Sequence, residues 1–259
     1  MLSSCTSFAP TFKEGQEHLR KTYGLTVDAL PAPNRTSAEN GKDIAQFIKS
    51  SYGKDGRKFI LIAYSKGAPD ALEGLAADPQ AAQAVAALIT VAGAIGGSPI
   101  ADIMPAQVEH WLSSLGEHGC QGDLAGALKS LRRKVRREFL ERHPHPGFPV
   151  YSIVAVSDRT NTSKLLLEPW ILLSFFGSRE DSLIESDDAV FPGGILLGAA
   201  RADHWAVALP FEDLSDPHIK SLVNHNHYPR TALLESLVRY VTADLAAADS
   251  SRVSRLPSR

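Results

Sequence analysis

The sequence predicts an α/β fold in which a mostly parallel central sheet is flanked by helices, because two patterns occur together. Short apolar segments of strand length alternate along the chain with segments of helical periodicity. The strand-like segments are continuous runs of valine, isoleucine, leucine and alanine, which is typical of strands buried on both faces. A length of 259 residues suffices for a large, well-buried core. We therefore expect a single domain over residues 1–259.

The N-terminal part is predicted to contain two helices around a short strand. The spacing of apolar residues favours a helix over 12–23 and a strand over 25–30, which two prolines close. A second helix is expected over 38–51. Thr36 and Glu39, at its start, have the spacing of a capping box.

The middle of the chain changes from alternating elements to helices alone. We expect a strand over 58–64, a helix over 68–76 and a buried strand over 85–95. Helical periodicity then dominates from about 98 to 147, around a long helix over 123–142. Such a block is most simply a cap or lid inserted over the carboxyl ends of the strands, where ligands bind in open α/β sheets.

The C-terminal part returns to the alternating pattern. We expect a strand over 150–156, an apolar helix over 165–176, a last strand over 195–200 and a closing amphipathic helix over 231–246. The apolar helix suits either the core or a wall of an acyl pocket, and we favour the core.

Composition excludes several classes of partner. A net charge of −2 gives no electrostatic basis for binding nucleic acid or an anionic membrane. The basic segment 129–137 carries apolar residues at helical spacing, which predicts a solvated helix face. Neither a transmembrane stretch nor a signal peptide is recognisable. We expect a soluble protein without integral membrane association, either cytoplasmic or a mature secreted form, and the sequence indicates no oligomeric state.

A serine stands at the junction of a predicted strand and a predicted helix. Ser65 is followed by Lys66 and Gly67, and this arrangement has the form of a nucleophile elbow. The turn lifts the hydroxyl above the sheet edge and aims the backbone N–H of Lys66 at the oxyanion that attack by Ser65 would form. Ala63 replaces the first glycine of the G-x-S-x-G pattern, so the motif is imperfect.

A serine nucleophile needs a base, almost always a histidine that a carboxylate holds. His204 directly follows the last predicted strand, which brings it to the same sheet edge as Ser65. His225 and His227 have a spacing that could ligate a metal, but no nearby cysteine or acidic residue completes the set. We interpret both as surface residues.

The acid must lie between the serine and the histidine in the chain order of this arrangement. Asp158 follows the strand over 150–156, whereas Asp181 lies on a later loop, and topology alone favours neither. Three other aspartates are interpreted as turn or solvated loop residues: Asp187, Asp188 and Asp203.

The span from about 51 to 210 resembles the bacterial triacylglycerol lipases and related esterases of the α/β-hydrolase fold. The likeness is carried by the elbow around Ser65, the strand start Val150-Tyr151-Ser152, the loop 180–184 and the sequence Asp203-His204-Trp205. Those lipases carry their acid on a loop shortly before the histidine. The resemblance therefore implies a triad of Ser65, His204 and Asp181, with Asp158 in reserve.

The chain departs from these lipases at three places. Glu180 and Ser182 replace the asparagine and glycine around the acid, which allows another backbone path for the loop. The family binds calcium through an aspartate two residues after the histidine, where this chain has Ala206, so we expect no metal and no other cofactor. The chain is also expected to begin one strand late, which leaves Met1 or Leu2 to present the second oxyanion N–H.

Apolar residues after the strand over 85–95 suggest how substrate is bound. Ile103, Met104 and Trp111 repeat near helical spacing, as in an amphipathic lid helix beside the nucleophile, or in an insertion that simply packs onto the body. Tyr64 and Trp205, the neighbours of Ser65 and His204, complete the expected set of substrate-binding residues.

We predict a serine hydrolase that cleaves small-molecule or lipid carboxylic esters through an acyl-enzyme, in preference to an amidase or thioesterase. The alternative is a non-catalytic or truncated α/β-hydrolase relative that binds apolar small molecules without turnover. The imperfect elbow, the altered acid loop and the late start of the chain support this alternative.

Overall fold

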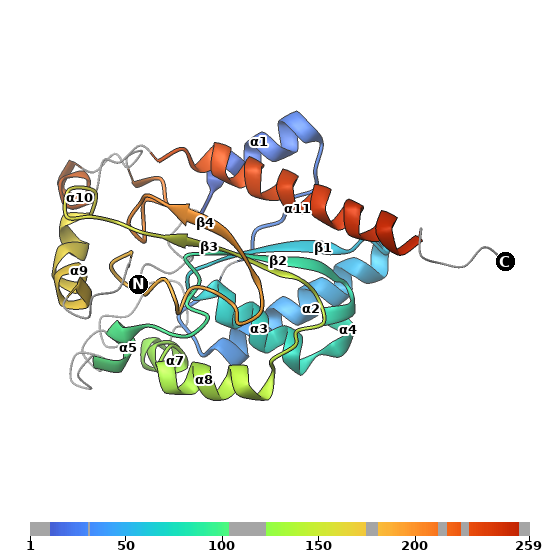
Figure 1. Cartoon of the computed structure of the whole chain (residues 1–259), viewed down its shortest axis with the longest axis horizontal. Coiled ribbons are helices and arrows are strands. Elements are labelled where there is room, and N and C mark those ends of the chain that lie inside the picture. Colours follow the sequence, from blue (N-terminus) through green and yellow to red (C-terminus); the bar gives the residue numbers. More distant parts are fainter. Residues whose placement is uncertain are drawn as a thin grey trace.

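The centre of the protein is a four-stranded parallel sheet (Figure 1). The computed structural model describes residues 11–30, 32–103, 123–174, 181–211, 217–223 and 228–253. The strands lie side by side in chain order: β1 (Phe59–Tyr64), β2 (Val85–Val91), β3 (Val150–Ala155) and β4 (Ile195–Ala200). The predicted α/β class is confirmed, and β4 has the bounds that the sequence predicts.

Helices cover both faces of this sheet (Figure 1). One face packs against α1 (Lys13–Tyr23) and α11 (Arg230–Val253), and the other against α2 (Ser37–Asp55), α3 (Gly67–Ala77) and α4 (Pro79–Gln83). Side chains of β2 point alternately to the two sides, because successive residues of a strand face opposite ways. Ile89 belongs to the core under α1 and α11, and Leu88 to the core under α2 and α3.

The start of α2 follows its sequence signal. The side chain of Thr36 accepts the backbone N–H of Glu39 at 3.3 Å, and the Glu39 carboxylate accepts the Thr36 N–H at 3.0 Å. This reciprocal arrangement confirms the predicted capping box. Helices α2 and α3 then touch through glycines, since a Cβ on Gly41 would lie 2.6 Å from the backbone nitrogen of Gly74.

The predicted helix over 123–142 is two helices, α7 (Leu124–Ser130) and α8 (Arg133–Arg142). The break follows from Leu131, which is fully buried and whose carbonyl accepts the N–H of Ser98 at 2.9 Å in place of a helical partner. The short helix α5 (Pro99–Ile103) opens this part of the chain.

Two predicted strands need correction. Residues 25–30 form no strand. Leu25 and Leu30 are exposed, and the Val27 carbonyl accepts a hydrogen bond of 2.6 Å from the Arg20 guanidinium. Strand β2 ends at Val91 and does not reach residue 95, because Ala92 has a φ of 45° and turns the chain.

The apolar segment after β3 begins with a short 3-10 helix, η1 (Lys164–Leu166), and continues as α9 (Leu167–Ser174). The preference for a core position holds for Leu166 and Leu173, which are buried, but not for Leu165, Ile171 and Leu172, which are exposed. Helices α9 and α10 (Pro217–Leu222) lie beyond the carboxyl ends of the strands (Figure 1). Among the described helices, none is both long and apolar enough to cross a membrane.

Candidate active site

The turn between β1 and α3 holds Ser65 in an unusual backbone conformation. Its φ is 53°, in the left-handed region that residues other than glycine rarely adopt. The Ser65 N–H donates to the Val91 carbonyl at 3.1 Å, and the Ser65 carbonyl accepts the N–H groups of Ala68 and Ala94, both at 3.1 Å. Such a conformation costs on the order of 1 kcal/mol and persists only when its surroundings enforce it.

Three side chains from separate loops meet at the carboxyl end of the sheet. The hydroxyl oxygen of Ser65 lies 2.7 Å from Nε2 of His204. The other ring nitrogen, Nδ1, lies 2.6 Å from Oδ2 of Asp181. Ser65 is half-buried, while His204 and Asp181 are buried. A continuous hydrogen-bonded chain therefore runs from the hydroxyl of a half-buried serine through an imidazole to a buried carboxylate.

The loop around Asp181 orients this carboxylate. Its Oδ1 accepts the backbone N–H groups of Leu183 at 3.0 Å and Ile184 at 2.8 Å, which leaves Oδ2 for the imidazole. The Asp181 carbonyl also accepts the N–H of His204 at 2.8 Å. Ser182 has a φ of 92°, so it adopts a conformation that favours glycine, although it is a serine.

Asp203 is a turn residue, one of the two interpretations that the sequence suggested, but its burial was not expected. It is fully buried, and its Oδ2 accepts both the N–H and the hydroxyl of Ser163, each at 2.6 Å. Its Oδ1 accepts the N–H groups of Trp205 at 3.0 Å and Ala206 at 2.8 Å. Asp203 is thus not solvated: its carboxylate joins Ser163 to the turn that carries His204. An aspartate before two free N–H groups is a turn signal, yet the contact with Ser163 is not visible in the sequence.

Asp187 and Asp188 differ from each other. Asp187 is exposed, as expected of a solvated loop residue, whereas Asp188 is half-buried. Burial raises the pKa of Asp188 to about 6, although the guanidinium of Arg133, 3.8 Å away, acts in the opposite direction.

Asp158, the reserve acid, has other partners. Its carboxylate accepts the side-chain amide of Asn161 at 2.9 Å and the Thr160 N–H at 2.8 Å. It also forms an exposed ion pair with Arg201 at 2.9 Å. No hydrogen bond joins it to His204 among the residues that the structure describes.

Tyr64 lies against His204. Its hydroxyl donates to the His204 carbonyl at 2.5 Å, and the two rings have centroids 5.2 Å apart. Burial raises the pKa of Tyr64 well above its usual value, so the phenol stays protonated and remains a donor. Its hydroxyl therefore contacts the loop that carries His204, whereas the sequence suggested a contact with substrate.

The other expected substrate-binding residues are distributed more widely. Trp205 packs edge-on against Phe211, with ring centroids 5.5 Å apart, and Ile103 is exposed at the end of α5. Four expected site residues lie outside the described residues: Met1, Leu2, Met104 and Trp111. The two histidines that were interpreted as surface residues, His225 and His227, lie outside them as well.

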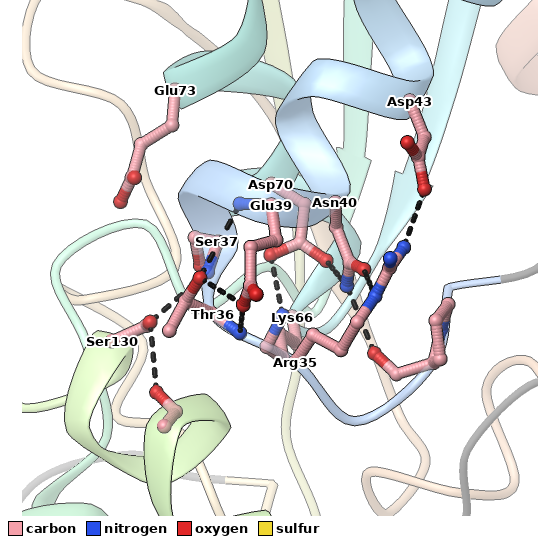
Figure 2. A network of polar contacts seen from close by, with 12 residues as sticks. Arg35, Thr36, Ser37, Glu39, Asn40, Asp43, Lys66, Asp70, Glu73 and Ser130 are labelled. Atoms are coloured by element: carbon pink, nitrogen blue, oxygen red, sulfur yellow. Dashed lines mark hydrogen bonds and ion pairs between the residues drawn. The ribbon is translucent and has the colours of Figure 1, made fainter. Parts of the chain in front are cut away.

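Lys66 directly follows the serine and precedes α3. In the described part of the chain, no acceptor takes its backbone N–H. Its side chain is buried and forms an ion pair with Asp70 at 2.6 Å (Figure 2). No three histidine, cysteine, aspartate or glutamate side chains among the described residues are grouped so that they could hold a metal.

Comparisons with known proteins assign the chain to a family. A scan of protein-family models finds no match, and neither does a search of curated proteins. The metagenomic carboxyl esterase MGS0156 matches with a TM-score of 0.86 and 33% identity, over 93% of this chain and 72% of that one.

Two other solved structures share the fold at lower identity. They are the mature lipase BlEst2 from Bacillus licheniformis (TM-score 0.54, 23% identity, 67% of this chain and 69% of that one) and phospholipase PlaB from Legionella pneumophila in complex with thio-NAD (TM-score 0.51, 17% identity, 70% and 41%). The extent and identity of the match to MGS0156 show that this chain belongs to the α/β-hydrolase-fold family of esterases and lipases.

Proposed function

We propose that this protein hydrolyses carboxylic esters, with Ser65 as nucleophile, His204 as general base and acid, and Asp181 as the carboxylate that orients the histidine. The observation that carries the proposal is the chain of hydrogen bonds, 2.7 Å and 2.6 Å long, from the Ser65 hydroxyl through His204 to Asp181. The match to a carboxyl esterase supports an ester as substrate.

In the first half of the reaction, Ser65 Oγ attacks the carbonyl carbon of the ester while its proton passes to Nε2 of His204. The carbonyl π electrons move to oxygen, and the resulting oxyanion accepts the backbone N–H of Lys66 and an N–H from Met1 or Leu2. Collapse of this intermediate breaks the bond to the alcohol oxygen. The alcohol leaves with the proton from His204, and the acyl group remains on Ser65.

In the second half, water attacks the acyl-enzyme and gives a proton to His204. A second oxyanion forms in the same place and collapses, which releases the carboxylic acid and returns the proton to Ser65. Asp181 keeps Nδ1 of His204 protonated throughout, because its Oδ2 accepts that hydrogen and its Oδ1 is already occupied by two backbone N–H groups.

We assign to the helical insertion over 98–147 the role of a cap over the site. In support, Ser98 at its start donates to the Leu183 carbonyl of the acid loop at 2.7 Å, and Arg133 of α8 lies 3.5 Å from Glu185. Exposed apolar side chains on α5, η1 and α9 favour a substrate with an apolar acyl or alcohol part; they are Ile103, Leu165, Ile171 and Leu172.

Labelling with a fluorophosphonate probe tests this function, because only an activated serine reacts. We expect wild type to be labelled and to hydrolyse short p-nitrophenyl esters, and Ser65→Ala to do neither. His204→Ala should also lose hydrolysis, since no other described group is placed to take the Ser65 proton. An unlabelled wild type, or equal labelling of Ser65→Ala, would favour a relative that binds apolar molecules without turnover.

A further inference from the structure

A buried polar network begins at Lys66, the residue that follows the proposed nucleophile in the chain (Figure 2). The ammonium of Lys66 donates to Oδ1 of Asp70 at 2.6 Å. The other carboxylate oxygen accepts the side-chain amide of Asn40, on α2, at 2.8 Å. The amide oxygen of Asn40 in turn accepts Nε of Arg35 at 3.1 Å. A single path of polar contacts thus connects the residue after Ser65 to the start of α2.

This network is expensive to bury. Asp70 is completely inaccessible, and the Lys66 side chain is only 11% exposed. Burial lowers the pKa of Lys66 and raises the pKa of Asp70, so burial opposes both charges while their mutual attraction favours both. Replacing a buried ion pair by well-packed apolar side chains is often neutral or stabilising. Stability alone therefore does not account for this pair.

The pair spans the first turn of α3, where the orientation of the Lys66 backbone is decided. Lys66 is the N-cap residue of α3, and Asp70 lies four residues later, one turn along the helix. The Asp70 N–H also donates to the Lys66 carbonyl at 3.2 Å. Lys66 is consequently held at two points by one residue, through its backbone carbonyl and through its side chain.

Helix α2 anchors this turn from behind. Asn40 precedes Gly41, at which α2 and α3 approach so closely that a Cβ would lie 2.8 Å from the Asp70 carbonyl oxygen. The amide of Asn40 is itself fixed, because it also donates to the Pro33 carbonyl at 2.9 Å. The position of Asp70 is therefore set by a second helix as well as by its own.

We propose that the buried pair of Lys66 and Asp70, held by Asn40, is a positioning device that aims the Lys66 backbone N–H at the oxyanion. The inference rests on the ester hydrolysis proposed above. Removing one oxyanion donor entirely costs roughly 100-fold or more in kcat. A donor that is present but free to turn costs part of this roughly 100-fold in kcat, because an effective donor must stay within about 0.5 Å and 10–20° of its productive geometry.

The test compares Asp70→Asn and Lys66→Met with wild type and with a control on the same helix, Glu73→Gln. Both test variants keep the size of the side chain and the backbone N–H, but they remove the ion pair. Glu73 accepts Nη1 of the buried Arg136 at 2.6 Å, so Glu73→Gln weakens another ion pair of α3 and removes a charge that acts on Lys66 through space, while the hydrogen bonds of Lys66 and Asp70 stay in place.

We expect Asp70→Asn and Lys66→Met to lower kcat for a p-nitrophenyl ester by about 10-fold, with KM changed less than about 2-fold. Binding of a trifluoromethyl ketone, which forms an oxyanion on attack by the serine, should weaken in parallel. The double variant should lose no more than either single one, because the pair acts as a unit. Glu73→Gln should lower the melting temperature and leave kcat unchanged.

Three results would overturn the positioning role. They are unchanged kcat in either folded test variant, an equal loss of kcat in Glu73→Gln, or additive losses in the double variant. If either single variant does not fold, the double variant Lys66→Met/Asp70→Asn decides, because it leaves neither charge buried without a partner; an unchanged kcat there overturns the role. A wild type that neither hydrolyses esters nor reacts with fluorophosphonate refutes the proposed function instead, so the two failures are distinguishable.

Discussion

The hydroxyl of Tyr64 donates a hydrogen bond of 2.5 Å to the backbone carbonyl of His204. Tyr64 is the last residue of β1 and directly precedes Ser65, so the residue beside the proposed nucleophile holds the loop of the proposed base. Two hydrogen bonds therefore hold His204 near the end of β1: one between its Nε2 and the Ser65 hydroxyl, and one from the Tyr64 hydroxyl to its carbonyl.

Tyr64→Phe removes this hydrogen bond and keeps the ring that lies over His204. We expect kcat to fall by about 10-fold and the free energy of unfolding by about 1–2 kcal/mol, because the variant leaves the His204 carbonyl without its donor. Ester hydrolysis and thermal denaturation measure the two effects. An unchanged kcat would show that the loop holds His204 without Tyr64.

The choice of acid can be decided by two matched substitutions. Asp181→Asn should lower kcat by about 10⁴-fold, as in serine proteases, since the amide no longer fixes the histidine tautomer. Asp158→Asn should change kcat little, because Asp158 binds Thr160, Asn161 and Arg201. A larger loss in Asp158→Asn than in Asp181→Asn would refute the proposed triad.

The sequence predicted those parts of the molecule that depend on a few consecutive residues. The capping box of Thr36 and Glu39 depends on four consecutive residues, and the apolar run of β4 fixes its bounds. The chain order of serine, acid and histidine limited the acid to Asp158 or Asp181, and only the resemblance to lipases put Asp181 first, which is the residue that the structure places against His204.

Those features that depend on distant partners were not predictable. A strand over 25–30 requires a neighbouring strand, which no local pattern guarantees. The break in the helix over 123–142 depends on Ser98, which takes the Leu131 carbonyl. The buried carboxylate of Asp203 accepts two hydrogen bonds from Ser163, 40 residues earlier in the chain.

Asp203→Asn should loosen the loop of His204. Both carboxylate oxygens of Asp203 accept backbone N–H groups, one from Ser163 and the other from Trp205 and Ala206. In the variant, the NH₂ group replaces one of these oxygens, so that a donor faces a donor. We expect a loss of about 2 kcal/mol in the free energy of unfolding and a lower kcat.

Ser163→Ala is the matched control for Asp203→Asn, because it removes one donor and leaves the three backbone contacts of the carboxylate intact. Its effect on stability should be smaller, about 1 kcal/mol, and its kcat close to that of wild type. Chemical denaturation and ester hydrolysis separate the two variants, and equal effects would contradict the role assigned to Asp203.

Asp188 makes the stability of the protein depend on pH in mildly acidic solution. It faces the cation of Arg133 and three acidic groups, Glu185, Asp102 and Asp187, and burial raises its pKa to about 6. The folded state therefore binds this proton more tightly than the unfolded state, whose aspartates have pKa values near 4. Its contribution to stability is complete below about pH 4 and is lost as the pH rises through 6.

Asp188→Asn removes the cost of burying a charged carboxylate, which the wild type bears above pH 6. Below pH 4 the substitution should change the stability little, because Asp188 is protonated in both the folded and the unfolded state. We expect the variant to melt at a higher temperature than wild type at pH 7. The corresponding gain in the free energy of unfolding is at most about 3 kcal/mol, and screening by solvent reduces it. At pH 4 the two proteins should melt together. A variant that melts lower than wild type at pH 7 would mean that the attraction between Asp188 and Arg133, 3.8 Å apart, outweighs the burial of the charge.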